Sequence, residues 1–167
     1  MIRALRYLGD PVLRKHADPV KKIGPEIRKL IDDMFETMDA AHGIGLAAPQ
    51  VGVMKRVIVT NVPEEDGSFT RGALINAEIV SFEEETELFE EGCLSIPHVR
   101  ADVDRPVGIR VRAIDGNGRK VDFLASDLYA RCIQHEVDHL NGVLFIDRAG
   151  ISEKKALKMM QTAEEDE

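Results

Sequence analysis

Apolar residues recur every three or four positions early in the chain, which is the spacing of an amphipathic helix. The stripe consists of Ile27, Leu30, Ile31, Met34, Phe35 and Met38. Gly24-Pro25 marks the start, because proline is favoured at the first helical position, and Gly43 marks the stop. The pattern predicts a helix over residues 24–42.

Runs rich in β-branched residues and period-two alternation predict strands further along. Residues 57–62 and 72–80 are rich in β-branched side chains. Residues 107–125 alternate apolar and polar side chains on both sides of an Asp-Gly-Asn-Gly turn at 115–118, so they predict a β-hairpin.

Two more helices are expected in the last third of the chain. One covers 126–141, with Ser126 or Asp127 as its N-cap and Asn141-Gly142 as a left-handed stop. The other covers 152–163, begins at Ser152 and packs on the domain through a modest apolar stripe. That stripe consists of Ala156, Leu157, Met160 and Ala163. The elements predict an α+β fold of mostly antiparallel strands around a central helix, with a C-terminal helix.

Length and composition favour one domain over residues 1–167, of which 152–167 form the C-terminal helix and an acidic tail. A chain of 167 residues with 44% hydrophobic residues can bury a core without disulfides, and two cysteines exclude a disulfide-rich scaffold. No apolar run approaches the roughly 18–20 residues of a membrane helix. Asp10 and Pro11 interrupt any signal-peptide core. A soluble cytoplasmic protein is expected.

The charge balance argues against a nucleic-acid-binding face. The chain has 22 basic and 30 acidic residues, for a net charge of −8. Four of the acids form the tail at 164–167, so the rest of the chain is only mildly acidic. A broad nucleic-acid face needs clustered Lys and Arg, so we expect no direct DNA binding.

The segment His135-Glu136-Val137-Asp138-His139 carries the strongest chemical signal. Two histidines at i and i+4 lie on one helical face about 6 Å apart, close enough to share a metal ion. Leu128 and Cys132 share that face, which places the histidines on the apolar side, where unpaired polar groups are costly. Glu136 flanks the metal, a position that suits a general base acting on metal-bound water.

Two histidines leave the metal short of protein ligands. Downstream, Asp147 and Glu153 lack a strong helical setting, whereas upstream Cys93 lies in an apolar-lined segment between a Gly and a Pro. A Cys93 thiolate would complete a three-ligand site with one position open, although a buried apolar role is the commoner fate of a free cysteine. Cys132 would instead close a structural zinc site, but it lies roughly 7.5 Å along the helix axis from the metal, so the pocket wall suits it better.

A third segment, residues 42–50 (HGIGLAAPQ), follows the first helix directly. Its glycines and alanines leave the backbone bare, so another chain could approach and bond to it. Gln50 offers a side-chain amide that could donate to an oxyanion. The segment lacks the Lys and Ser/Thr of a phosphate loop.

Three motifs together resemble the signature of the peptide deformylase family, in its order and spacing. They are GIGLAAPQ at 43–50, EGCLSIP at 91–97 and QHEVDHLNG at 134–142. The opening LGDPVLR, the Arg100 and Arg105 spacing and the length extend the likeness over essentially the whole chain. It is most similar to the short bacterial-type enzymes with a C-terminal helix.

The resemblance implies hydrolytic removal of formate from N-formylmethionine at the N-terminus of nascent chains, with a metal-bound water as nucleophile. The metal ligands would be Cys93, His135 and His139, and Glu136 would be the general acid/base. Gln50 and the backbone N–H of Leu94 would stabilise the oxyanion. The implied substrate-binding residues are Ile44, Gly45, Phe89, Gly92, Arg100, Leu128 and Cys132, of which Ile44, Gly45 and Gly92 would pair with the substrate backbone.

The pocket differs from part of the family, because Phe89 and Arg131 stand where some relatives carry aliphatic residues. The implied cofactor is one divalent ion per chain, Fe(II), which Zn, Ni or Co can replace. The implied partner is the ribosome, reached through the C-terminal helix, with no membrane partner. Two other classes stay open at this point: a metallopeptidase that cleaves internal amides and a non-catalytic zinc domain.

Overall fold

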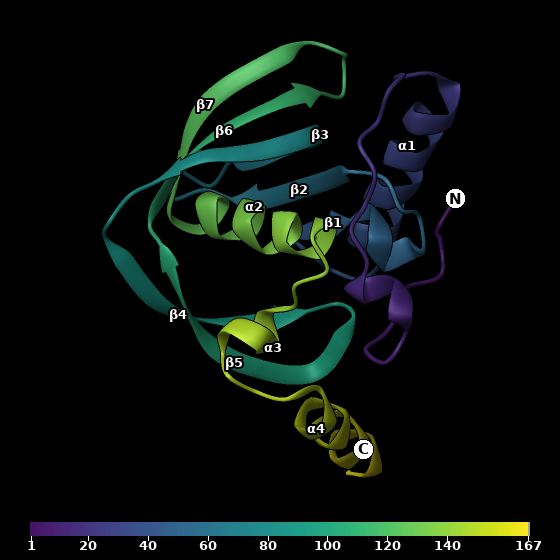
Figure 1. Ribbon diagram of the computed structural model, residues 1–167, viewed down its shortest axis with the longest axis vertical. Coiled ribbons are helices and arrows are strands. Elements are labelled where there is room, and N and C mark those ends of the chain that lie inside the picture. The colour runs from purple at the N-terminus through teal and green to yellow at the C-terminus, as the bar shows by residue number, and fades with distance from the viewer. Residues whose placement is uncertain (167) are drawn as a thin grey trace.

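The computed structural model, which describes residues 1–166, places one helix between a five-stranded sheet and a separate two-stranded hairpin (Figure 1). The sheet has the order β1-β2-β3-β6-β7 and every pairing is antiparallel. Its strands are β1 (Gly45–Ala47), β2 (Val57–Pro63), β3 (Phe69–Phe82), β6 (Gly108–Asp115) and β7 (Lys120–Ser126). The hairpin pairs β4 (Thr86–Cys93) with β5 (Ile96–Pro106).

The central helix is α2 (Asp127–Leu140), which lies across the sheet with the hairpin on its other side. The remaining helices are α1 (Pro25–Ala40), α3 (Phe145–Arg148) and α4 (Glu153–Glu165), with single 3-10 turns at η1 (Pro11–Arg14) and η2 (Ala48–Val51). The predicted α+β class, with antiparallel strands around one helix and a C-terminal helix, is confirmed.

Three separate apolar clusters hold these layers together. The first joins α2 to the sheet through residues such as Ile58, Val111 and Ile133. The second packs α1 against β2 and β3, and the third packs α3, α4 and η1 on β5. The sheet and the hairpin that flank α2 are therefore each held by a packed apolar core.

The end of the first helix and the presence of a second hairpin differ from the prediction. Helix α1 ends at Ala40 rather than at residue 42, because His42 adopts a left-handed conformation with φ 58°. The hairpin β4–β5 was not predicted, because β4 is exposed for five of its eight residues and carries no apolar alternation. The two strands of this hairpin are held together by backbone hydrogen bonds, which require no alternation of apolar and polar residues in the sequence.

The C-terminal helix α4 packs on β5 through a face that differs from the predicted stripe. Ala156 is fully buried and Met160 packs beside it as predicted, but Leu157 is 39% exposed and Met159 takes part in the cluster instead. The Ser152 hydroxyl accepts a hydrogen bond from the backbone N–H of Lys155, so Ser152 caps the helix as expected. The tail residue Glu167 lies outside the described residues. Among residues 1–166, no helix combines the length and apolarity that crossing a membrane requires.

Gly142, the predicted stop of the metal-binding helix, allows a close backbone approach. It has φ +74°, and a Cβ there would lie 2.5 Å from the carbonyl oxygen of Arg14. We expect Gly142→Ala to lower the free energy of unfolding by roughly 2 kcal/mol or more, because left-handed strain and a backbone clash add. Gly67→Ala is the matched control, with φ +87° and open space around it, and should cost only about 1 kcal/mol. Urea denaturation measures both; equal losses would show that the Arg14 contact yields easily.

Candidate metal centre

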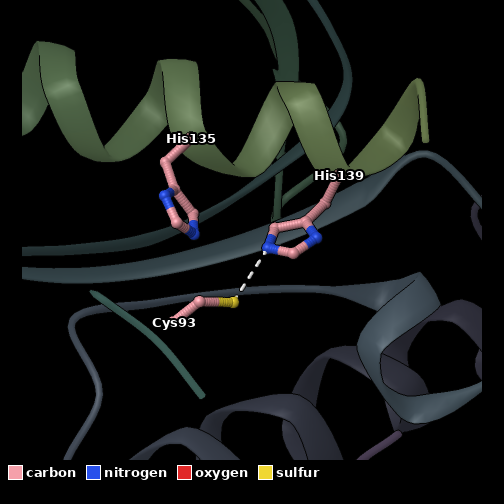
Figure 2. Close-up of side chains that lie close together, drawn as sticks. All are labelled: Cys93, His135 and His139. Atoms are coloured by element: carbon pink, nitrogen blue, oxygen red, sulfur yellow. Dashed lines mark hydrogen bonds between the residues drawn. The ribbon is translucent and has the colours of Figure 1, made fainter. Parts of the chain in front are cut away.

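Cys93, His135 and His139 point toward one another in the structure (Figure 2). The two histidines project from α2 toward the end of β4, where Cys93 lies. Their ligand atoms all lie within 4.8 Å of one another, and Cys93 Sγ is 3.3 Å from His139 Nε2. Thus the structure brings together the three ligands that the motifs imply.

The spacing and chemistry of these atoms fit a divalent transition-metal ion. Ligand bonds of about 2.3 Å to sulfur and 2.0 Å to nitrogen that meet at a tetrahedral angle place those two atoms about 3.5 Å apart. The observed 3.3 Å between Cys93 Sγ and His139 Nε2 is close to that value. Burial lowers the pKa of His139 well below its usual range, which keeps its ring neutral with a lone pair free to bind. Three protein ligands also leave a fourth position for water or substrate.

Glu91 orients the first histidine of the site. Its Oε1 lies 2.9 Å from His135 Nδ1, and since a carboxylate accepts, the hydrogen is on Nδ1 and Nε2 faces the metal position. Both Arg105 and Arg131 donate to the same carboxylate, at 2.6–3.0 Å. A carboxylate behind a ligating histidine fixes the ring and raises its basicity.

The Glu91 carboxylate belongs to a larger group of charges, of which all but the half-exposed Arg148 are buried. We call this group the Glu91 cluster: Glu91, Arg105, Arg131, Asp138 and Arg148. Arg105 donates also to Asp138, and Asp138 accepts two further bonds from Arg148. Burial alone would raise the pKa of Glu91, but hydrogen bonds from His135 and Arg105 outweigh it and lower that pKa to about 2. Glu91 is therefore ionised at neutral pH.

Glu136 is buried beside the two histidines and faces the cavity of the site. Burial raises the pKa of its carboxyl to about 7. Its Oε1 has no hydrogen-bond partner among the described residues, and neither has Nδ1 of His139. A carboxyl with a pKa near neutrality and a free oxygen is suited to take up and return a proton.

Gln50 reaches the site from η2 and is held in one orientation. Its Oε1 accepts from the backbone N–H of Ala47, so its Nε2 points toward β4. That Nε2 lies 3.1 Å from Ser95 Oγ and 3.6 Å from Cys93 Sγ. The amide therefore presents a fixed donor next to the metal ligands.

A cavity of about 380 Å³ is lined by two of the three ligands, Cys93 and His135. Every substrate-binding residue that the resemblance implies lines it: Ile44, Gly45, Phe89, Gly92, Arg100, Leu128 and Cys132. Gly45 is required by space, because a Cβ there would lie 2.6 Å from Glu136 Oε2 and 2.7 Å from Cys132 Sγ. His42 and Arg131 line the cavity as well, although the motifs do not mark them.

Cys132 stays apart from the metal ligands. Its thiol donates to the backbone carbonyl of Ile44 at 3.5 Å, and burial raises its pKa well above the usual range. A protonated thiol is a poor ligand. Within residues 1–166, the one group of His, Cys, Asp or Glu close enough to hold a metal omits Cys132.

Sequence reasoning missed most of the Glu91 cluster. Glu91 opens the EGCLSIP motif and Asp138 lies inside the helix motif, yet neither was assigned a role. Asp138 could have been found from the sequence, because an acid next to His139 on a buried helix needs a charged partner. Arg105 was noted only as part of the family resemblance and Arg148 not at all, because only the fold brings them to α2.

The chain is similar over most of its length to proteins of one family. The model of the family described as polypeptide deformylase matches residues 2–155. The chain is 50% identical to the peptide deformylase of Rhizobium meliloti (strain 1021) over 146 residues, which are 87% of this chain and 84% of that protein. The crystal structure of the peptide deformylase from Ehrlichia chaffeensis in complex with actinonin superposes with a TM-score of 0.89 at 39% identity, covering 99% of this chain and 98% of that one.

A second solved structure carries a peptide. It is the class I type b peptide deformylase from Acinetobacter baumannii with Met-Ala-Ser bound, at a TM-score of 0.83 and 35% identity. The similarity covers 89% of this chain and 98% of that one.

Proposed function

The chain belongs to the polypeptide deformylase family, and from that premise we propose that it hydrolyses the formyl group from N-formylmethionine at the start of nascent polypeptides. The observation that carries the proposal is the convergence of Cys93, His135 and His139 beside a buried Glu136 whose pKa is about 7. The Met-Ala-Ser complex of the Acinetobacter relative supports a peptide with N-terminal methionine as the product.

A divalent ion held by Cys93, His135 and His139 would supply a Lewis acid that makes water nucleophilic at neutral pH. Glu136 takes the proton from the attacking water, because its carboxylate is beside the ligands and has a free oxygen. Once its carboxyl is neutral, it returns the proton to the leaving amine of methionine. Formate and a free N-terminus result.

Gln50 and the backbone N–H of Leu94 stabilise the charge that develops on the formyl oxygen. Gln50 Nε2 is already oriented toward the site by the bond that its Oε1 accepts from Ala47, and the N–H that now faces Cys93 Sγ is the one that would turn to the formyl oxygen. Leu94 follows Cys93 directly and lines the same cavity.

Ile44, Gly45 and Gly92 hold the peptide backbone on both sides of the cavity. Strand β1 is an edge of the five-stranded sheet, so its free side can accept a substrate strand. The methionine side chain enters the apolar end of the cavity, with Ile44, Phe89, Leu128 and Cys132 around it. Arg100, at the mouth near Gly92, contacts the following residues of the peptide.

Formate release from formyl-Met-Ala-Ser, measured with and without a chelator, tests the proposed function. Release that stops on chelation and resumes when metal is restored supports it. Cleavage of an internal amide would identify a metallopeptidase. No formate with a retained, tightly bound zinc would identify a structural zinc domain.

We infer that the working metal is Fe(II), since a thiolate with two imidazoles forms a site soft enough for it. Zinc lies above iron in the Irving–Williams order, so zinc can displace it during purification. Protein loaded with iron should be active but lose activity under oxygen or peroxide, while protein loaded with nickel or cobalt should be steadier. Activity followed during exposure to air measures this; equal decay of the iron and nickel forms would contradict the inference.

We propose that α4 contacts the ribosome, with Lys154, Lys155 and Lys158 facing rRNA phosphates. Glu164 and Glu165 end the same helix and Asp166 caps it, so these acids should repel the rRNA phosphates. Removing residues 164–167 should strengthen a weak, salt-sensitive binding to ribosomes in sedimentation assays. Activity on short peptides is the control and should not change. Identical binding before and after truncation would show that the acids lie clear of the contact.

We place this reaction in the cytoplasm. Cys93 and Cys132 are both free thiols, as is usual in a reducing compartment. A thiolate ligand also needs protection from oxidation.

A further inference from the structure

Arg131 is a charged side chain in the wall of the cavity, next to the apolar residues proposed to hold the methionine side chain. It lies on α2, one position before Cys132, and lines the cavity together with Phe89 and Leu128. Only 8% of Arg131 is exposed. The proposed function assigns no role to this residue.

Three hydrogen bonds fix the guanidinium in place. Nη1 donates to Glu91 Oε2 at 2.6 Å and to the backbone carbonyl of Val103 at 2.9 Å. Nη2 donates to the backbone carbonyl of Glu87 at 2.6 Å. The Phe89 ring lies 5.5 Å from Cζ, as in a cation–π contact. The group is therefore held by the hairpin as well as by α2.

These bonds do not use all of the donors of Arg131. A guanidinium has five N–H groups, and three of them are engaged. Within residues 1–166, the Nε–H and one Nη2 N–H have no acceptor among the recorded hydrogen bonds. A buried, fixed donor group with unused N–H bonds is a position where a ligand acceptor gains most.

The local charge favours an acceptor too. The Glu91 cluster sets three guanidinium groups, of which that of Arg148 is half-exposed, against two carboxylates, so one positive charge is left over. Arg131 is the arginine of this cluster that lines the cavity. An oxygen with partial negative charge would therefore be stabilised at this wall.

We propose that Arg131 is a specificity-determining residue that lets the pocket accept a side chain with a hydrogen-bond acceptor at the position of the methionine sulfur. The substrate of that class is a peptide that begins with N-formylmethionine sulfoxide. It has the length of methionine and carries a sulfoxide oxygen, which Arg131 would meet with its unused N–H groups. The proposal rests on the proposed function, because it concerns the same cavity and the same reaction.

A wholly apolar pocket would give the opposite result. It would bury the sulfoxide oxygen without a partner and disfavour that substrate by about tenfold to a hundredfold. Because the donor is fixed by three bonds, it should also favour one of the two sulfoxide epimers. Both effects arise from Arg131 alone.

The test compares kcat/KM for three peptides, formyl-Met-Ala-Ser, its methionine-sulfoxide form resolved into epimers, and formyl-norleucine-Ala-Ser. For the wild type we expect the better sulfoxide epimer within about tenfold of methionine. Arg131→Met should lower the sulfoxide-to-methionine ratio by about tenfold or more, the effect of a hydrogen bond to a charged group, and abolish the epimer preference. The norleucine-to-methionine ratio should stay unchanged.

Arg148→Met is the matched control, because it removes a positive charge from the Glu91 cluster at a residue that does not line the cavity. Its sulfoxide-to-methionine ratio should equal that of the wild type. Ratios within one variant cancel any change in metal content or folded fraction.

Two results would overturn the inference while leaving the proposed function intact: an equal loss for all three peptides in Arg131→Met, or a wild type that already rejects both epimers as strongly as that variant. Absence of formate from formyl-Met-Ala-Ser with the wild type would refute the proposed function and the inference together. Arg131→Lys gives a second variant that keeps the charge. It should retain part of the sulfoxide activity but lose the preference between epimers.

Discussion

Glu136→Gln should lower formate release by at least about 10²–10⁴-fold, the usual effect of removing a general acid/base. Glutamine keeps the size of the side chain but cannot take a proton. Because Glu136 is beside the ligands and is not one of them, the variant should fold and keep about one metal ion per chain. Elemental analysis beside the formate assay measures both quantities.

Glu26→Gln, on the exposed side of α1, is the matched control for loss of a carboxylate and should behave as wild type. A Glu136→Gln protein that retains full activity would remove the proton role. A Glu136→Gln protein without metal would instead show that the carboxylate ligates. We expect the loss of formate release to be large because burial raises the pKa of Glu136 to about 7, which suits proton transfer at neutral pH.

Cys93→Ala should strip the site of metal and abolish activity, because a three-ligand site loses its one anionic protein donor. The fall in metal affinity should exceed the roughly 10–100-fold that is typical when only a partner of a ligand is removed. Equilibrium dialysis against a metal buffer measures the affinity, and formate release measures the activity.

Cys132→Ser is the matched control, since it changes the other thiol by one atom. It should keep the metal and weaken only the binding of the methionine side chain, because Cys132 contacts Ile44 in the pocket wall. A metal-free Cys132→Ser protein with metal retained in Cys93→Ala would reverse the ligand assignment and indicate a closed structural site.

The helical part of the site could be predicted because its signal is local. His135 and His139 are one turn apart, so a single helix places both on one face, and the apolar stripe around them gives the side that is buried. The same logic predicted α1 from its stripe and the β6–β7 hairpin from its turn.

The parts that failed depend on distant contacts. The β4 strand has few apolar positions, and it is ordered by pairing with β5 and by Arg131 donating to the carbonyl of Glu87. Glu91 meets Arg105 and His135 only after the hairpin docks on α2. Leu157 falls on the apolar stripe of a helical wheel, but it is partly exposed because α4 packs on β5 through Met159 and Met160 instead. No short window of sequence contains these relations.

The Glu91 cluster also limits which substitutions this sequence can tolerate one at a time. Removing a fully buried member such as Arg105 leaves buried charge without its partner at a cost of about 3–5 kcal/mol, whereas joint replacement by apolar residues of similar volume can be neutral. Arg105, for example, serves Glu91 and Asp138 at once, so a change at either acid alters the setting of the other. We therefore expect Glu91, Arg105 and Asp138 to pass from a charged to an apolar arrangement only through coupled substitutions.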